Sequence, residues 1–219
     1  MRILAFDTAT TATTVALAHD ERVLERRDDP PPGARPRHTS RLLPLIAELL
    51  EEAGWRWDEL DRVAVGVGPG TFTGLRIGVA TARALAQARG LELVGVSTLE
   101  SLSLNSEADT ICAVLDARRR EVFAAAWRQR SQVLQAAAFD PATLAEWLSP
   151  DALAVGDGAV AFRHVLERSG ALIPDDGSDL HRVTAVNHCR LGLLADPSDL
   201  DAVRPEYVRL PDAESARKP

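Results

Sequence analysis

Lysine is almost absent from this chain. Of the 25 basic residues, all but Lys218 are arginine. A Walker-type phosphate loop needs a lysine after its glycines, and a Schiff-base enzyme needs a lysine amine at its reacting centre. Both kinds of site are therefore excluded from the body of the fold.

Cysteine and long apolar runs are scarce as well. Two cysteines, Cys112 and Cys189, cannot build a disulfide framework, which is typical of a protein in a reducing cytoplasm. No apolar run approaches the roughly 20 residues that a membrane span requires. The first ten residues place Asp7 after a short apolar run, unlike a secretory signal. We therefore expect a cytoplasmic protein with no membrane contact.

The motifs of several enzyme classes are missing. There is no H-E-x-x-H, and none of the five histidines has a second histidine four residues away, so no metal site is predicted. The G-x-S-x-G turn of serine hydrolases is also absent. A net charge of −7 argues against a broad nucleic-acid-binding face. The sequence shows no complete catalytic constellation.

What the chain does contain is ordinary globular composition, with 46% hydrophobic and 26% charged residues. Its 219 residues suffice for one large or two small domains with real cores.

The stretch from Leu60 to Gly90 organises the first half of the chain. A β-branched, apolar run at Arg62–Val67 predicts a buried strand, and Leu75–Arg89 predicts a mostly buried helix that Gly90 ends. The turn between them contains four residues that cannot continue a strand, which we interpret as a structural or interface turn: Gly68, Pro69, Gly70 and Gly74.

The spacing of these glycines also resembles a dinucleotide-binding turn. Against that alternative, no acidic residue closes the next strand, Glu92–Ser97, where a ribose-binding carboxylate would stand.

Three short strands joined by tight turns open the chain, at Arg2–Thr8, Thr13–Ala18 and Val23–Arg26. The turn after the first strand begins with Asp7-Thr8. Nucleotide-binding folds of the actin and Hsp70 type hold phosphate and magnesium at such a turn, but they place glycine where this chain has Ala9 or Thr10. Asp7 and Thr8 are therefore weak candidates for cofactor binding, and the alternative is a simple turn-forming role.

A helix is predicted from His38 to Ala53, closed by Gly54, with Thr39 or Ser40 as its N-cap. Its apolar residues spread over roughly 200° of the helix surface, about twice what one sheet face requires. Either the helix lies between the core and a loop, or the extra apolar width meets another protein.

The rest of the chain alternates strands and helices. We expect strands at Glu92–Ser97, Thr110–Leu115, Glu121–Arg128, Ser131–Ala138 and Leu153–Gly156, and helices at Thr98–Leu104, Ala142–Leu148, Val160–Ser169 and Val183–Ala195. Both halves open with a three-strand meander followed by helix–strand alternation, which suggests an internal duplication. This pattern predicts an α/β protein of two subdomains, at residues 1–105 and 106–219.

Two charged or polar motifs remain to be placed. Asp116-Ala117-Arg118-Arg119 is either a polar contact surface or a solvated hairpin tip. His38 begins a helix, where a capping or interface role is more typical than metal ligation.

Several of these motifs together resemble the TsaB family, also called YeaZ. They are Asp7-Thr8, His38-Thr39-Ser40-Arg41-Leu42-Leu43-Pro44, Gly68 to Ala82 with the specific run G-P-G-T-F-T-G-L-R, Val96 to Glu100, Asp116-Ala117-Arg118-Arg119-x-Glu121-Val122 and Pro205-x-Tyr207-x-Arg209. The matches span almost the whole chain.

The resemblance implies an actin-like/Hsp70-like (ASKHA) fold of two subdomains, each with a mixed sheet and flanking helices. It also implies a role in making threonylcarbamoyladenosine beside the tRNA anticodon. In that family the transfer is catalysed by the paralogue TsaD, whose metal-binding histidines lie four residues apart. This chain has His38 but Leu42 in place of the second histidine. The alternative is a stand-alone ATP-binding enzyme of the same superfamily.

The resemblance further implies a non-catalytic subunit that activates a TsaD-type transferase and is joined by a TsaE-type ATPase. We expect a homodimer when the chain is alone, only indirect contact with tRNA, and ATP and metal on the partners rather than on this chain. The implied partner interface lies on the two helices and consists of His38, Leu42, Leu45, Ile46, Leu49, Arg76, Ile77, Ala80, Thr81 and Ala84.

Overall fold

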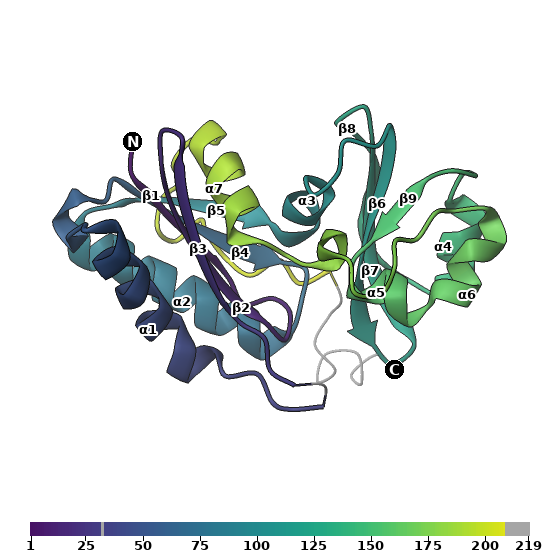
Figure 1. Cartoon of the computed structure of the whole chain (residues 1–219), viewed down its shortest axis with the longest axis horizontal. Coiled ribbons are helices and arrows are strands. Elements are labelled where there is room, and N and C mark those ends of the chain that lie inside the picture. The colour runs from purple at the N-terminus through teal and green to yellow at the C-terminus, as the bar shows by residue number, and fades with distance from the viewer. Residues whose placement is uncertain (32, 209–219) are drawn as a thin grey trace, which may run out of the picture. The chain divides into compact units, whose positions relative to one another are not determined.

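The computed structural model describes residues 1–31 and 33–208 (Figure 1). It separates into two units. The first unit comprises Met1–Ser101 together with Val183–Pro205, and the second contains Leu102–Arg182 and the described residues that follow Pro205. Of the positions singled out above, Arg209 and Lys218 lie outside the described residues.

The first unit is built on a mixed five-stranded sheet with the order β3-β2-β1-β4-β5. Its strands are β1 (Ile3–Asp7), β2 (Thr13–His19), β3 (Arg22–Asp28), β4 (Arg62–Gly68) and β5 (Glu92–Ser97). The first three form the predicted antiparallel meander, whereas β4 lies parallel to both β1 and β5. The strands predicted in this half are therefore confirmed.

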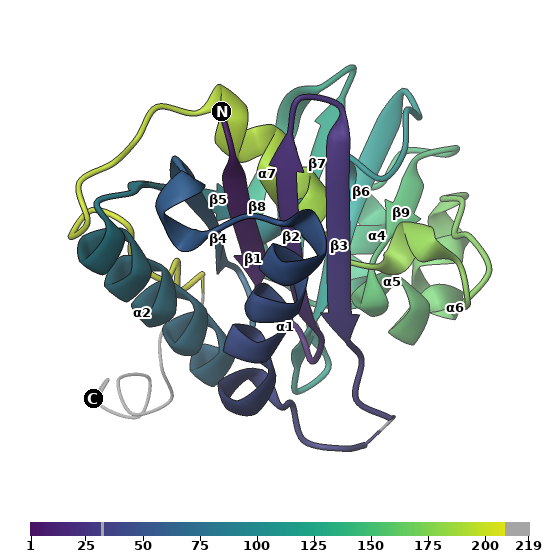
Figure 2. The same ribbon diagram turned by 60° about the vertical axis from the view of Figure 1, so that its left-hand side comes forward.

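Helices cover both faces of this sheet (Figure 2). Because successive strand residues point to opposite faces, Leu4 and Phe6 pack with α1 (His38–Ala53) and α2 (Phe72–Arg89). Ile3 and Ala5 pack on the other face with α7 (Ala185–Leu194). The short α3 (Thr98–Ser103) follows β5 directly, and a 3₁₀ turn, Trp57–Glu59, precedes β4. Strands β1, β2 and β4 are largely buried, whereas the edge strands β3 and β5 are partly exposed.

Helix α7 corrects the predicted domain boundary. We expected the second subdomain to run to residue 219, but residues 183–205 belong to the first unit. Arg62 is one reason: its buried guanidinium pairs with Glu92 and donates to the carbonyl oxygens of Gly192 (2.6 Å) and Ala195 (2.9 Å) at the end of α7. These charge-assisted contacts hold the last helix on the first sheet.

The second unit has a four-stranded mixed sheet with the order β8-β7-β6-β9. Its elements are β6 (Thr110–Arg118), β7 (Glu121–Arg128), β8 (Ser131–Phe139), α4 (Pro141–Trp147), β9 (Leu153–Val155), α5 (Asp157–Ala161) and α6 (Arg163–Leu166), with 3₁₀ turns at Glu167–Ser169 and Asp179–His181. As in the first unit, three antiparallel strands lie beside a parallel fourth. This shared order supports the predicted duplication.

Several local predictions differ from the structure. Strand β6 runs to Arg118, three residues beyond the predicted end at Leu115. Helix α1 has Arg37 as its N-cap residue, so the predicted caps Thr39 and Ser40 lie inside the first turn, where the Ser40 hydroxyl donates to the Arg37 carbonyl. Helix α2 starts at Phe72, three residues earlier than expected. The predicted helix Val160–Ser169 is interrupted at Phe162, whose φ and ψ of −117° and 24° are not helical.

Gly54 and Gly90 end α1 and α2 in the left-handed conformation, as predicted for both. Among the described residues, no helix combines the length and apolar character that crossing a bilayer would require.

Candidate functional site

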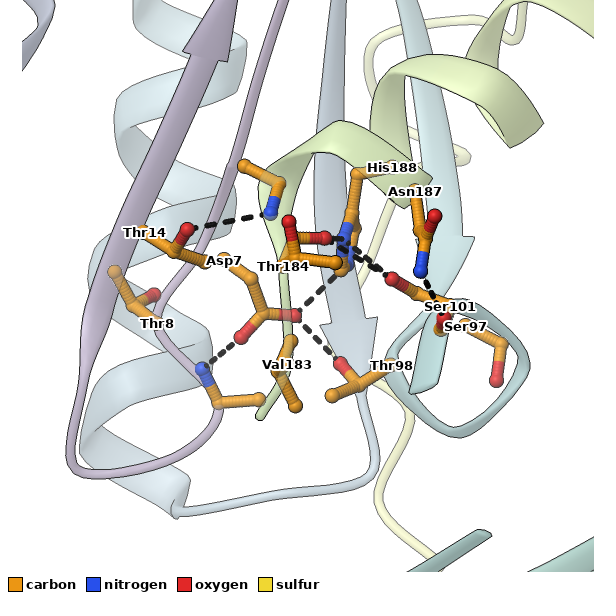
Figure 3. A network of polar contacts seen from close by, with 12 residues as sticks. Asp7, Thr8, Thr14, Ser97, Thr98, Ser101, Val183, Thr184, Asn187 and His188 are labelled. Atoms are coloured by element: carbon orange, nitrogen blue, oxygen red, sulfur yellow. Dashed lines mark hydrogen bonds and ion pairs between the residues drawn. The ribbon is translucent and has the colours of Figure 1, made fainter. Parts of the chain in front are cut away.

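The turn between β1 and β2 begins with Asp7, whose carboxylate is the centre of a buried polar network (Figure 3). One oxygen, Oδ1, accepts a hydrogen bond from the Ala9 amide at 2.7 Å. The other, Oδ2, accepts one from the Thr98 hydroxyl at 2.7 Å and lies 3.0 Å from Nε2 of His188. Both carboxylate oxygens are thus engaged by groups of the first unit.

The charge of Asp7 is stabilised inside the protein. Burial alone raises the pKa of this carboxyl. The contacts from His188, Thr98 and Ala9 together lower the pKa by more than burial raises it, so the pKa lies below its usual value. Asp7 is therefore ionised at neutral pH. The Nε2 atom of His188 faces this carboxylate at 3.0 Å.

His188 continues the network on its other side. Its Nδ1 lies 2.9 Å from the Ser101 hydroxyl and 3.0 Å from the Thr184 carbonyl. Asn187 donates to the Ser101 carbonyl at 2.9 Å. The network therefore links α7, α3 and the first turn of the chain, and Figure 3 shows these side chains converging from separate elements.

Ser101, His188 and Asp7 follow the order hydroxyl, imidazole, carboxylate, which is the arrangement of a nucleophilic triad. The exposed fractions of these side chains are 0%, 0% and 1%, however, so no substrate reaches the hydroxyl. The Ser101 hydroxyl also donates to the Thr184 carbonyl at 3.3 Å. The arrangement is structural. Sequence reasoning missed it because Ser101 and His188 lie 87 positions apart, and no local motif connects them.

The start of α7 is fixed by a second polar group. Glu25 Oε1 accepts hydrogen bonds from the hydroxyls of Thr14 and Thr184 and from the Ala185 amide. Thr184 also caps the helix by accepting from the Val186 amide at 3.2 Å. A carboxylate at a helix N-terminus is favoured by the helix dipole, so this contact helps to hold α7 beside the Asp7 network.

The glycine-rich turn packs directly against the Asp7 turn. A Cβ atom on Gly66 would lie 1.8 Å from Asp7 Oδ2, and one on Gly74 would lie 1.9 Å from the Thr8 carbonyl oxygen. The Thr8 hydroxyl donates to the Gly74 carbonyl at 2.7 Å, and the Thr71 amide donates to the Ala9 carbonyl at 2.7 Å.

These contacts define the part played by the predicted turn residues. Gly68 and Pro69 are buried between β4 and α2, Gly70 is half-buried, and Gly74 lies in the first turn of α2. The segment serves as a close-packing structural turn, which is the interpretation we preferred over a dinucleotide site.

The weak cofactor candidates lie in this sealed region. Asp7 and Thr8 are 1% and 0% exposed, and the space beside Thr8 is filled by Gly74 and Gly78 of α2. In the described residues, no group of three or more His, Cys, Asp or Glu side chains could hold a metal ion.

His38 begins α1 and is buried. Its Nδ1 lies 2.8 Å from the Thr13 hydroxyl, while its Nε2 has no hydrogen-bond partner within the described chain. Burial lowers the pKa of His38, although the nearby Asp7 carboxylate opposes that shift. His38 therefore acts as a neutral core residue, and its predicted place on an exposed interface is wrong.

The predicted interface on α1 is wrong at four further positions. Leu42, Leu45, Ile46 and Leu49 are at most 2% exposed and belong to the core cluster formed with the sheet. The reason is that α1 packs against β2, β3 and α2 at once, so a wide apolar arc is covered by its own unit. The accessible apolar residues of α1 are instead Leu43, Pro44 and Ala47, Leu43 being 51% exposed.

On α2 the predicted positions are accessible. Arg76, Ala80 and Ala84 are exposed, while Ile77 and Thr81 are half-buried. The helix also exposes 42% of Phe72, over whose ring the Arg76 guanidinium lies at 3.7 Å. The accessible sides of the two neighbouring helices together form what we call the two-helix face: Leu43, Pro44, Ala47, Phe72, Arg76, Ile77, Ala80, Thr81 and Ala84.

Comparison with known proteins agrees with this fold and these motifs. The family model described as "TsaD: tRNA N6-adenosine threonylcarbamoyltransferase" matches residues 30–162. The tRNA threonylcarbamoyladenosine biosynthesis protein TsaB of Escherichia coli is 34% identical over 187 residues, which cover 80% of this chain and 79% of that protein. The chain belongs to the TsaB family.

Two further similarities extend over nearly the whole chain. TsaB of Bacillus subtilis is 29% identical, with coverage of 98% of this chain and 97% of that one. The solved structure of YeaZ from Pseudomonas aeruginosa superposes with a TM-score of 0.78 at 28% identity, covering 94% and 99% of the two chains. The predicted fold of the YeaZ family, with two subdomains that each contain a mixed sheet, is thereby confirmed.

Proposed function

We propose that this chain is a non-catalytic accessory subunit of a TsaD-type transferase that forms threonylcarbamoyladenosine next to the tRNA anticodon. One observation carries the proposal. The turn at which a nucleotide-binding relative would hold phosphate is sealed by the chain's own groups, with Asp7 and Thr8 at most 1% exposed. A subunit that lacks an accessible reactive site contributes by binding its partner.

The same observation weighs against the alternative of a stand-alone ATP-binding enzyme. Such an enzyme needs an ionised, accessible carboxylate near magnesium, whereas Asp7 is ionised but already surrounded by His188, Thr98 and the Ala9 amide. A metal-binding pair would need a second histidine one helical turn after His38, and the buried Leu42 occupies that position. ATP and metal then belong to the TsaD-type and TsaE-type partners.

The two-helix face is the surface that we assign to the transferase, and to a second copy when the chain is alone. It presents Leu43 and Phe72, which are two of the exposed large apolar residues of the chain, beside small residues of α2 such as Ala80 and Ala84. Small residues allow a partner helix to approach closely, and apolar side chains there gain free energy when they are covered.

Substitutions on this face test the proposal. We expect Leu43→Glu and Ala80→Glu each to weaken binding to the organism's own TsaD-type protein at least tenfold, because each places a charge in an apolar contact. The matched control is Leu194→Glu, on α7, where the leucine is 86% exposed. Binding is measured by titration calorimetry, with circular dichroism to show that each variant is folded.

Two results would contradict the proposal. Unchanged binding by both face variants would show that the interface lies elsewhere. Transfer of threonylcarbamoyl to tRNA by this chain without the transferase would show that it is itself the enzyme. Calorimetry of the isolated chain with ATP and magnesium is expected to give no binding heat.

A further inference from the structure

A groove lies within the second unit, between α4 and the stretch that runs from α6 into the following 3₁₀ turn (Figure 1). We call it the α4–α6 groove. Its volume is about 430 Å³, which is within the range of small-molecule sites. The residues that line it all belong to the second unit: Ala142, Ala145, Glu146, Leu148, Val165, Arg168 and Ser169.

The floor of the groove is apolar. Ala142 and Ala145 lie three residues apart on α4, and Leu148 follows the end of that helix. Val165 completes the floor from α6. Leu148 is buried, while Ala145 and Val165 are half-buried, so the floor offers mainly methyl groups. Such a floor favours an aliphatic ligand body, because the contact removes apolar surface of both from water.

Two charged side chains on opposite walls supply the polar recognition. The Ser169 hydroxyl is already engaged, since it donates to the Leu166 carbonyl at 2.7 Å and accepts from the Ala171 amide at 3.3 Å. Glu146 stands on α4 and Arg168 in the 3₁₀ turn across the groove. Neither side chain forms a hydrogen bond or an ion pair with the other, or with any further residue that the structure describes.

We propose that the α4–α6 groove binds a small zwitterion with an aliphatic body, such as an aliphatic amino acid. The ligand carboxylate accepts hydrogen bonds from Arg168, its ammonium group donates to Glu146, and its body covers the floor. An anion without an ammonium group is repelled by Glu146, and a cation without a carboxylate is repelled by Arg168. A ligand that carries both charges satisfies both walls.

The size of the groove favours a small molecule over a protein segment. Helix α4 has seven residues, which gives it a length of about 10 Å, and α6 has four residues. A stable protein interface buries about 800 Å² on each partner. That is more surface than a groove between two such short helices offers.

The inference goes beyond the proposed function and does not depend on it. The two-helix face, to which we assign the transferase, consists of residues of α1 and α2 in the first unit, and none of them lines the groove. Ligand binding can therefore be measured on the full chain without its partners.

The experiment compares three probes that share one aliphatic body: leucine, 4-methylpentanoate, which lacks the ammonium group, and 3-methylbutylamine, which lacks the carboxylate. In ¹H–¹⁵N NMR spectra of the full chain, leucine should shift the amide signals of Ala145, Glu146 and Val165 in a saturable way. We expect a Kd on the order of 1 mM, since so few atoms make contact. The other two probes should bind at least about tenfold more weakly, because each meets one wall of like charge.

Variants of the two walls test the charge assignment. Glu146→Gln and Arg168→Gln each change an exposed side chain, so both variants should remain folded. Each should weaken leucine binding about tenfold, because one end of the zwitterion loses its partner. Each should also reverse one preference: 4-methylpentanoate should bind to Glu146→Gln at least as tightly as leucine, and 3-methylbutylamine should do so to Arg168→Gln. Arg128→Gln removes an exposed arginine of the same unit outside the groove, and it should bind leucine within about twofold of the unmodified chain.

Three results would overturn the inference. The first is no saturable shift of the groove signals at about 50 mM leucine, fifty times the expected Kd. The second is equal affinity of the unmodified chain for all three probes, which would mean that the groove recognises only the aliphatic body. The third is unchanged leucine affinity in either wall variant, which would place the ligand away from that wall. None of these results bears on binding of the transferase, so the inference and the proposed function fail separately.

Discussion

At Gly66 the absence of a side chain allows Asp7 to approach strand β4. A Cβ atom added to Gly66 would lie 1.8 Å from Asp7 Oδ2 and 3.1 Å from His188 Nε2. Three elements, β1, β4 and α7, therefore meet at one residue without a side chain. The ionised Asp7 can be buried there because its hydrogen-bond donors approach from the remaining directions.

Gly66→Ala is expected to lower the free energy of unfolding by about 3 kcal/mol, because an added methyl group collides with a buried carboxylate. Urea denaturation measures the change. The control is Gly177→Ala, where no atom lies within 4 Å of the added Cβ and the change should stay within about 0.5 kcal/mol. Equal midpoints for the Gly66 variant and the unmodified chain would refute the close approach.

His38 predicts a pH dependence of stability. Its folded-state pKa is lowered from 6.5 by burial, so on acidification the unfolded chain binds the proton first. The stabilising contribution is complete above pH 6.5 and is lost as the pH falls toward the folded-state pKa, with a slope of at most about 1.4 kcal/mol per pH unit.

Urea midpoints measured from pH 7.5 to pH 5 should therefore fall less steeply for His38→Asn than for the unmodified chain. His164→Asn, which removes an exposed histidine, is the control variant. The same slope in all three proteins would mean that His38 titrates normally in the folded state.

At the scale of elements, periodicity and turn residues predicted most strands and helices to within one or two residues, β5 and β7 among them. Which side of α1 remains accessible could not be predicted in that way. A wide apolar arc is equally consistent with a second protein and with a corner between a sheet and another helix, and only the packing of α2 beside α1 decides between them. The hydrogen-bond partners of Asp7 could not be predicted from local patterns either, because they come from elements that are distant in the sequence.

Two substitutions on α1 test which side of the helix packs against the sheet and α2. Leu49→Ala should cost between about 2 and 5 kcal/mol, because it leaves a cavity in the core beneath the sheet. Leu43→Ala, on the accessible side of the same helix, should cost less than about 1 kcal/mol. Similar losses for the two variants, measured by urea denaturation, would show that α1 is rotated from the orientation described.

At the scale of the whole molecule, most of the second unit, Leu102–Arg182, is inserted between the two segments of the first unit. The residues that flank this insertion are close together, since the Ser101 hydroxyl donates to the Thr184 carbonyl and Asn187 donates to the Ser101 carbonyl. A short linker can therefore replace the inserted residues without moving α7.

We expect residues 1–101 joined to residues 183–205 through a short Gly-Ser linker to unfold cooperatively. Residues 1–105 alone should not, because they lack α7 and leave one sheet face uncovered. Calorimetry and near-ultraviolet circular dichroism compare the two fragments. A cooperative transition in residues 1–105 would show that α7 is dispensable for the first unit.

The position of α7 also affects how the chain matures on the ribosome. Helix α7 packs on an apolar surface of the first sheet, and this surface is synthesised long before α7 itself. It is formed by Ile3, Ala5, Ala16, Ala64 and Val94. More than eighty residues, including 102–182, are translated between the sheet and α7. During that time this surface of the nascent sheet is exposed to water and to chaperones. Slow translation through that interval would lengthen the period in which the half-finished sheet can aggregate.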